Sequence, residues 1–397
     1  MRRPMRPRPA PEDMLTDALR LIRTDGVGPL TYRRLLARYA THEAALDALP
    51  RLAREGGRAT PPAIPSRAAV EQERAALDRI GGRFLLLGTP DYPPLLALLA
   101  DAPPILACLG DPGVLAGRAV AMVGGRNATA NGERIAETLA AELAQAGITV
   151  VSGLARGIDA AVHAGALAAG RTVAVVAGGL DCPYPPEHAD LQRRIAEAGA
   201  VLAESPLGTT PQARHFPRRN RIIAGLALGV VVVEAALRSG SLITARLAQE
   251  AGREVFAVPG SPLDPRARGS NDLIRQGAQI TETAADILDN LPDHPDREGL
   301  ARAPLFARPR VPAAPAGPVP DPADPREVPP GDPPPEILAD ARSRLVALLG
   351  PAPTAVDDLL RRCQLPPAAA LAALLELEIA GRIETLPGQR VALLAGP

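Results

Sequence analysis

The stretch GVVVVEA (Gly229–Ala235) decides how we interpret the fold of this chain. Its four consecutive valines leave no polar face, which is typical of a strand covered by helices on both sides. The helical pattern RIIAGLA (Arg221–Ala227) precedes it almost directly. A helix that leads at once into a doubly buried strand indicates an α/β sheet.

Five more short apolar runs repeat this arrangement. With the valine run they form the series Ala119–Val123, Ile148–Val151, Val173–Ala177, Val201–Ala203, Val230–Val233 and Val255–Val258. Helical patterns fill the gaps, and ERIAETLAAELAQAG ends on Gly147 as a helix C-cap. Repeats of this kind predict parallel strands with right-handed crossovers. The predicted fold class is therefore α/β, with an extended Rossmann-like doubly wound sheet.

The rest of the chain divides by composition. We predict a disordered tail at 1–10, a small helical N-terminal domain at 11–75, the Rossmann-like domain at 76–295, a proline-rich linker at 296–335 and a winged-helix domain at 336–397. The linker follows from 13 prolines between Pro304 and Pro335, too many for a packed core. In the last domain we predict helices at Glu336–Leu349, from Thr354 and from Pro366, then a hairpin turning at Pro387–Gly388.

In the N-terminal domain, Leu15, Ala18, Leu19 and Ile22 share one face at helical spacing. The segment DGVGPL (Asp25–Leu30) then breaks the pattern, and Thr31 is a candidate N-cap of the next helix. Such a Gly-Val-Gly turn resembles a helix-hairpin-helix, whose backbone N–H groups can bind phosphates. A tight turn inside a small helical domain explains it equally well.

Composition excludes several kinds of chemistry. All 44 basic residues are arginines, so there is no lysine for a P-loop or a Schiff base. The three cysteines (Cys108, Cys182, Cys363) form no C-x-x-C pair, and the five histidines show no metal-ligand spacing. We therefore expect no metal, no cofactor and a reducing, cytoplasmic location. The most apolar stretch reaches Glu234 too soon to span a membrane.

Positive charge gathers in ARHFPRRNRIIAG (Ala213–Gly225), although the net charge of the chain is zero. Between residues 205 and 233 there are four arginines and no acid. In doubly wound sheets, ligands bind at the carboxyl ends of the strands, and the loops at these ends carry glycine and arginine here. An arginine-rich edge without carboxylates indicates a polyanionic ligand. We expect Arg221 to be structural and Phe216 or Tyr184 to be candidates for stacking on a base.

Six motifs in order closely resemble the DNA-processing protein A family (DprA, also called Smf). They are MVGGRNATANG (Met122–Gly132), SGLARGIDAAVHAGAL (Ser152–Leu167), AGGLDCPYPPEHADL (Ala177–Leu191), ESPLGTTPQARHFPRRNRIIAGLA (Glu204–Ala227), SGSLITARLAQEAGREVFAVPGSP (Ser239–Pro262) and GSNDLIRQGA (Gly269–Ala278). The resemblance implies a non-catalytic homodimer that binds single-stranded DNA without sequence preference. It implies that the protein protects incoming DNA and loads the RecA recombinase onto it during natural transformation and DNA recombination.

The resemblance also implies a set of DNA-binding residues. These are Gly124, Gly125, Arg126, Ser152, Gly153, Arg156, Gly178, Gly179, Phe216, Arg218, Arg219 and Asn220. The sequence departs from the family at two positions: Gly125 stands where serine is frequent, and Pro186 where many members have a basic residue. The family's hydroxyl contact at position 125 and its phosphate contact at position 186 are therefore in question for this chain.

A different function remains open, that of a nucleotide-processing Rossmann enzyme of the lysine-decarboxylase-like group. Members of that group pair a glycine-rich loop with a catalytic glutamate, and Glu234 is the candidate acid in this sequence.

The winged-helix domain differs from one that reads DNA. Its third helix, PPAAALAALLELEIAG, carries no arginine and includes Glu376 and Glu378, so we interpret it as a protein contact rather than a reader of a DNA groove.

Overall fold

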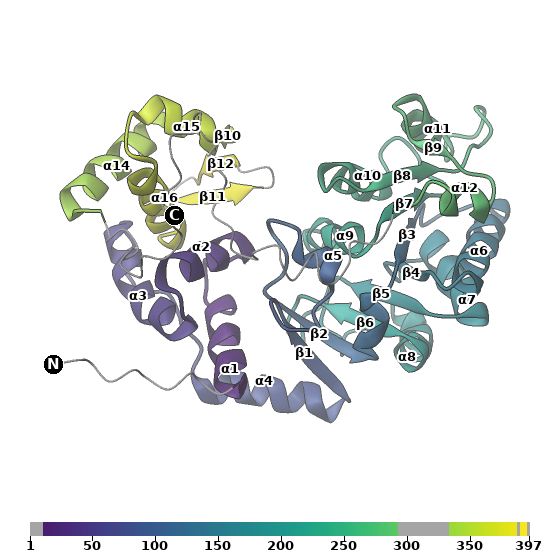
Figure 1. The fold of residues 1–397 in the computed structure, drawn as a ribbon, viewed down its shortest axis with the longest axis horizontal. Helices are drawn as coiled ribbons and strands as arrows, with labels where there is room; N and C mark the ends of the chain where they lie inside the picture. Colours follow the sequence, from purple (N-terminus) through teal and green to yellow (C-terminus); the bar gives the residue numbers. More distant parts are fainter. Residues whose placement is uncertain (1–10, 293–332, 387–389, 395–397) are drawn as a thin grey trace, which may run out of the picture. The chain divides into compact units, whose positions relative to one another are not determined.

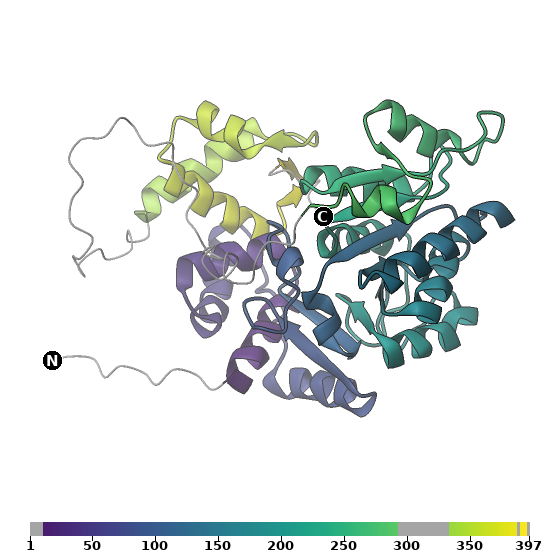
Figure 2. The ribbon, with the colours of Figure 1, turned by 45° about the vertical axis from the view of Figure 1, so that its right-hand side comes forward.

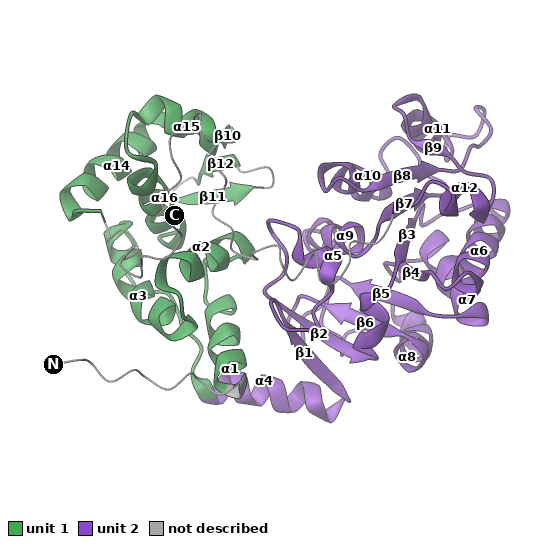
Figure 3. Cartoon of the chain, in the orientation of Figure 1, with its two compact units in different colours: residues 1–67, 306–397 green, residues 68–305 purple. Residues whose placement is uncertain are grey.

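The structure is a computed structural model that describes residues 11–292, 333–386 and 390–394. It divides into two compact units, one formed by residues 1–67 with 306–397 and the other by residues 68–305 (Figure 3). The predicted tail, residues 296–332 of the predicted linker and the turn at Pro387–Gly388 lie outside the described residues. Among the described residues, no helix has the length and apolar character that a membrane span requires.

A nine-stranded sheet with the order β1-β2-β6-β5-β4-β3-β7-β8-β9 forms the centre of the second unit (Figure 1). Its strands are β1 (Gly82–Leu86), β2 (Ile105–Gly110), β3 (Ala119–Val123), β4 (Thr149–Ser152), β5 (Thr172–Val176), β6 (Ala200–Ala203), β7 (Gly229–Val232), β8 (Glu254–Ala257) and β9 (Gln279–Ile280). Its helices are α4 (Arg67–Arg79), α5 (Pro94–Ala97), α6 (Ala130–Gln145), α7 (Ile158–Ala169), α8 (Ala189–Ala198), α9 (His215–Leu226), α10 (Ser241–Glu250), α11 (Arg268–Arg275) and α12 (Ala284–Leu288).

All six predicted strands are present, and they pair in parallel from β6 to β8. The sequence analysis missed three strands. Of these, β1 and β2 extend the sheet in antiparallel pairing, and the short β9 adds a parallel edge. The strands β1 and β2 lack the repeated strand–helix spacing that revealed the others, because they pair outside the crossover pattern.

The strands of the sheet centre are buried on both faces, as the valine run predicts. Along β7 and the residue that follows it, Val230 and Val232 belong to one core cluster, while Val231 and Val233 belong to the other. Helices α9 and α10 cover the first face, and α6, α7 and α12 cover the second (Figure 2). This alternation requires apolar residues at every strand position.

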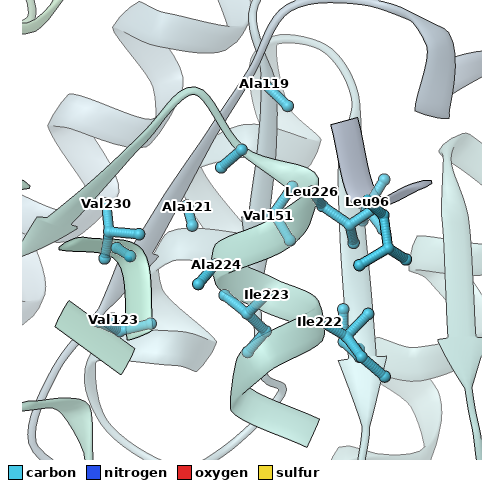
Figure 4. Packing of buried hydrophobic residues seen from close by; sticks show 14 of the residues in the cluster. Leu96, Ala119, Ala121, Val123, Val151, Ile222, Ile223, Ala224, Leu226 and Val230 are labelled. Carbon is cyan, nitrogen blue, oxygen red and sulfur yellow. The ribbon is translucent and has the colours of Figure 1, made fainter. Parts of the chain in front are cut away.

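The second half of α9 anchors the helix in the first core cluster. Its residues Ile222, Ile223, Ala224 and Leu226 pack with Ala119, Ala121 and Val123 of β3 and with Val230 of β7 (Figure 4). The charged first half of α9 is therefore held at a fixed place relative to the strand ends.

The first unit combines the N-terminal helices with the winged helix. Its elements are α1 (Pro11–Ile22), α2 (Pro29–Tyr39), α3 (His42–Glu55), α14 (Pro335–Leu348), β10 (Thr354–Ala355), α15 (Val356–Cys363), α16 (Pro367–Ile379), β11 (Ile383–Leu386) and β12 (Arg390–Leu393). The three strands form a small antiparallel sheet with the order β10-β12-β11. Three helices with this sheet confirm the predicted winged-helix architecture.

Two of the predicted caps in this unit are wrong. Helix α2 begins at Pro29 with Gly28 as its N-cap, and Thr31 is buried inside the helix. Thr354 pairs with Val391 in β10, so α15 begins after it without a side-chain cap. Helix α2 begins earlier than predicted because the φ angle of Pro29 suits the first turn of a helix. Helix α15 begins later because Thr354 pairs in a strand. In the other unit, Thr129 is the N-cap of α6, and its side chain accepts a hydrogen bond from the Gly132 N–H at 2.8 Å.

One ionisable group in the core couples stability to pH. His163 of α7 is fully buried, and its Nδ1 lies 2.8 Å from the Thr172 hydroxyl. That hydroxyl donates to the carbonyl of Val150, so it accepts from Nδ1–H of His163. Burial, then the nearby Arg219 and His188, lowers the pKa of His163 from 6.5 to about 3.

We expect the parent chain to lose stability in acid through His163. Between pH 6.5 and about 3 the unfolded chain binds a proton at this residue and the folded chain does not, so folding weakens as the pH falls. The loss from this group is about 2 kcal/mol between pH 6.5 and pH 5. His163→Gln should remove it, which chemical denaturation of both chains across this range would measure. Identical pH profiles for the two chains would contradict the assignment.

Candidate functional site

The candidate site lies at the carboxyl ends of the parallel strands. The order of strands reverses between β3 and β7, and ligands of doubly wound sheets bind at this point. The two loops that leave these strands contact each other, since the Gly125 N–H donates to the Glu234 carbonyl at 2.7 Å. The loops after β4 and β5 and the start of α9 border the same region.

Arginine and aromatic side chains from three of these segments, the loops after β3 and β5 and the start of α9, meet around Phe216. The Arg126 guanidinium lies 4.8 Å from the centre of the Phe216 ring, and that of Arg219 lies 5.9 Å from it. Tyr184 approaches the same ring edge-on, with 5.8 Å between ring centres. The predicted residues Arg126, Phe216 and Arg219, which come from two separate motifs, therefore form one cluster. Tyr184 belongs to it as well, and an aromatic at a loop tip was its only signal in the sequence.

Arg219 is the buried member of this cluster. Its exposed fraction is 6%, and its guanidinium occupies the space above Gly153, where an added Cβ would lie 1.5 Å from Nη1. Burial lowers the pKa of Arg219 to about 10, Asp159 opposes this shift and Arg126 reinforces it. The side chain therefore remains a cation at neutral pH. Glycine at position 153 is needed because any side chain would displace this cation.

Asp159 supplies the counter-charge below the cluster. Its carboxyl group is buried in the first turn of α7 and accepts a hydrogen bond from the Ala155 N–H at 3.3 Å. Burial raises the pKa of Asp159, while Arg219, the Ala155 N–H, Ser152 and Arg126 act in the opposite direction. One buried carboxyl group thus faces two guanidinium groups, which leaves the surface of the cluster positive.

The basic stretch forms the first turns of α9, rather than the loop that we expected. Helix α9 begins at His215, so Arg218 and Arg219 lie next to its N-terminus, and its first turn contains no acid. Arg214 and Arg218 are exposed. Positive side chains at a helix N-terminus are repelled by the positive end of the helix dipole. An anion bound there would offset this repulsion.

The predicted glycines lie beneath the cluster as close-packed backbone. An added Cβ at Gly124 would meet Ile158 at 2.4 Å, and one at Gly178 or Gly179 would meet the backbone of the loop after β6 at 2.6 Å. The space at Gly125 is less restricted, with the nearest atom 3.5 Å away. Ser152 is fully buried and donates to the Met122 carbonyl at 2.7 Å, so its hydroxyl joins two strands inside the protein.

Three remaining polar residues have protein partners. Arg156 is exposed but forms an ion pair with Glu187. Asn220 donates from Nδ2 to the Gly240 carbonyl at 3.3 Å. Arg221 is buried, donates to Glu204 and to the Asp101 carbonyl, and is therefore structural, as expected.

A pocket under the cluster is too small for a nucleotide. It is lined by Gly153, Ala155, Val176, Ala177, Gly178, Cys182, Tyr184, Pro211, Phe216 and Arg219, and leaves about 10 Å³ free. This space is on the order of one water molecule. A nucleotide ligand must therefore contact the rim, where Arg126 and Phe216 lie.

The candidate catalytic acid Glu234 has a structural contact. Its side chain accepts a hydrogen bond from the Thr129 N–H at 2.8 Å, at the N-terminus of α6. Oε2 also fills the space beside Gly132, where an added Cβ would lie 2.4 Å away. Within the described ranges, no group of three or more histidine, cysteine or acidic side chains is placed to hold a metal ion.

Three families match consecutive parts of the chain. The family described as DNA recombination-mediator protein A matches residues 83–292, the DprA-like N-terminal HHH domain matches 12–76, and the DprA winged helix domain matches 329–389. These ranges follow the architecture described above.

Individual relatives agree with these matches. Protein Smf of Escherichia coli is 39% identical over 329 residues, which cover 82% of each chain. DNA processing protein DprA of Bacillus subtilis is 44% identical over 221 residues, 55% of this chain and 74% of the relative. The crystal structure of DNA processing protein A from Streptococcus pneumoniae superposes with a TM-score of 0.59 at 34% identity and covers 70% of this chain and 99% of its own. The chain therefore belongs to the DprA/Smf family of DNA-processing proteins that act in recombination.

Proposed function

We propose that this protein binds single-stranded DNA, independently of sequence, along the edge of the sheet where Arg126, Phe216 and Arg219 meet. The observation that carries the proposal is the stacking of two guanidinium groups on one phenylalanine, with a single buried carboxyl group to balance them. Guanidinium groups pair with phosphates in a bidentate manner, and aromatic rings stack on unpaired bases of any identity.

The geometry divides the site into two kinds of contact. Arg126 and Arg218 are exposed and can meet backbone phosphates directly. Arg219 is buried behind Phe216 and supplies a fixed positive potential. Phosphate contacts position a strand without reading its bases, which agrees with binding that ignores sequence. Membership of a family that mediates DNA recombination supports the same ligand.

The enzyme alternative receives less support. It requires Glu234 to act on a substrate, whereas this carboxyl group already accepts a hydrogen bond from the start of α6. We therefore propose a binding function and assign no catalytic residue.

Arg126→Ala and Arg218→Ala should each weaken binding of a single-stranded oligonucleotide by roughly tenfold, since each removes a charge-assisted contact with a phosphate. The double variant should bind weakest, and all base sequences should be affected equally. The matched control is Arg171→Ala, an exposed arginine beside the amino end of β5, at the opposite edge of the sheet. Fluorescence anisotropy measures each affinity.

The salt dependence of binding tests the phosphate model on the same variants. Each lost phosphate contact should lower the log–log slope of affinity against salt by about 0.7. A double variant that is folded and keeps the parent affinity and slope would place the DNA elsewhere.

Gly153→Ala should weaken DNA binding without removing any charge. The added methyl group would occupy the position of the Arg219 guanidinium and force it to move. Gly117→Ala is the control, because it adds a methyl group to an exposed glycine before the amino end of β3, at the opposite edge of the sheet, with no atom within 4 Å of the new Cβ. Equal affinity for both variants would show that the position of Arg219 does not matter for binding.

We further propose that the protein acts as a homodimer that shields single-stranded DNA from nucleases and loads RecA onto it. The folded chain should sediment as a dimer, and saturating amounts should slow nuclease digestion of a bound oligonucleotide. When the unsubstituted protein is added to RecA and single strands coated with a single-strand-binding protein, strand exchange by RecA should become faster. The Arg126→Ala/Arg218→Ala variant should not have this effect. If both proteins stimulate strand exchange equally, loading of RecA does not depend on this DNA site.

A further inference from the structure

The third helix of the winged-helix domain has more apolar surface than its own domain can cover. Along α16, the residues Ala370, Ala373, Leu374 and Leu377 belong to the winged-helix core. A second set is also buried but lies outside that core cluster: Ala369, Ala372, Leu375, Glu376 and Ile379. A helix that is buried around its whole circumference packs against two partners.

The second partner within the first unit is the N-terminal helical domain. The end of α3 is in tight contact with α16, since a Cβ added at Gly56 would lie 2.0 Å from the Glu376 carbonyl oxygen and 2.7 Å from the Ala380 Cβ. Arg34 of α2 donates to Glu378 at 3.1 Å and to the Thr385 hydroxyl at 3.4 Å. Both members of the Arg34–Glu378 ion pair are mostly buried.

The Gly-Val-Gly turn takes part in the same contact. A Cβ added at Gly26 would lie 3.5 Å from the Ile379 carbonyl oxygen, and Val27 is buried. This turn is the part of a helix-hairpin-helix that meets phosphates, and the third helix is the part of a winged helix that meets a DNA groove. In this chain the turn lies beside the carboxyl end of α16, with Val27 buried and Gly26 exposed.

We infer that the winged-helix domain of this chain is the intramolecular partner of its N-terminal helical domain, and that α16 is a docking helix between them rather than a DNA-reading helix. The charges agree with this role: α16 carries no arginine, and its Glu378 meets a cation of the N-terminal domain. The buried Glu376 is paired with Arg342 of α14 within the winged helix, and its neighbours Ala372, Leu375 and Ile379 supply apolar contacts.

Gly56 provides a sharp test in the full-length chain. Its φ of −70° suits any residue, so Gly56→Ala should leave the N-terminal domain intact and clash only with α16. Hydrogen exchange followed by mass spectrometry should show exchange in α3 and α16 about tenfold faster, and exchange in α9 unchanged. Gly350→Ala, in the winged-helix domain after α14 and with no atom within 4 Å of the new Cβ, should exchange like the parent.

A charge exchange keeps the test decisive if Gly56→Ala fails to fold. Arg34→Glu and Glu378→Arg should each speed exchange in α3 and α16, and the double variant should restore protection, because the ion pair is re-formed with reversed polarity. Protection should not change when the protein is diluted. Parent-like protection in Gly56→Ala and in both single charge variants would overturn the inference, and so would protection that is lost on dilution, which indicates docking between two copies.

Discussion

The parallel pairing of β3 with β7 is the contact on which the candidate site depends. It joins strands that are more than a hundred residues apart in the chain, from Ala119–Val123 to Gly229–Val232, and creates the point where the strand order reverses. The Gly125–Glu234 backbone hydrogen bond then holds the two departing loops together. Because both strands are buried on both faces, this arrangement cannot shift without exposing apolar surface.

The cluster of arginines is stable because other parts of α9 hold it in place. Its first turns carry positive charge where the helix dipole disfavours it, while Ile222, Ile223 and Leu226 hold its second half in the core. Arg221 adds a buried ion pair with Glu204. The cluster is thus preorganised, so that the proposed binding of DNA would cost little conformational entropy.

The two units divide the proposed tasks. The second unit carries every residue of the proposed DNA site, whereas in the first unit α16 of the winged helix packs against the end of α3. The third helix of the winged helix carries no arginine that would attract phosphates, and its buried apolar residues suit a protein partner. A domain class therefore does not by itself reveal which ligand its members bind.

The sequence by itself determined the parallel core, the winged helix and the arginine-rich strand ends, because these follow from periodicity, proline and glycine positions and residue chemistry. It also separated Arg221 from the other arginines. Only the tertiary structure decided that Arg219 is buried over Gly153, that Tyr184 contacts Phe216 and that Ser152 lies inside the protein. The sequence also did not predict the antiparallel strands β1 and β2 or the contact between α16 and Gly56. All of these features depend on packing between segments that are distant in the chain. Local sequence patterns do not show which distant residues will pack together.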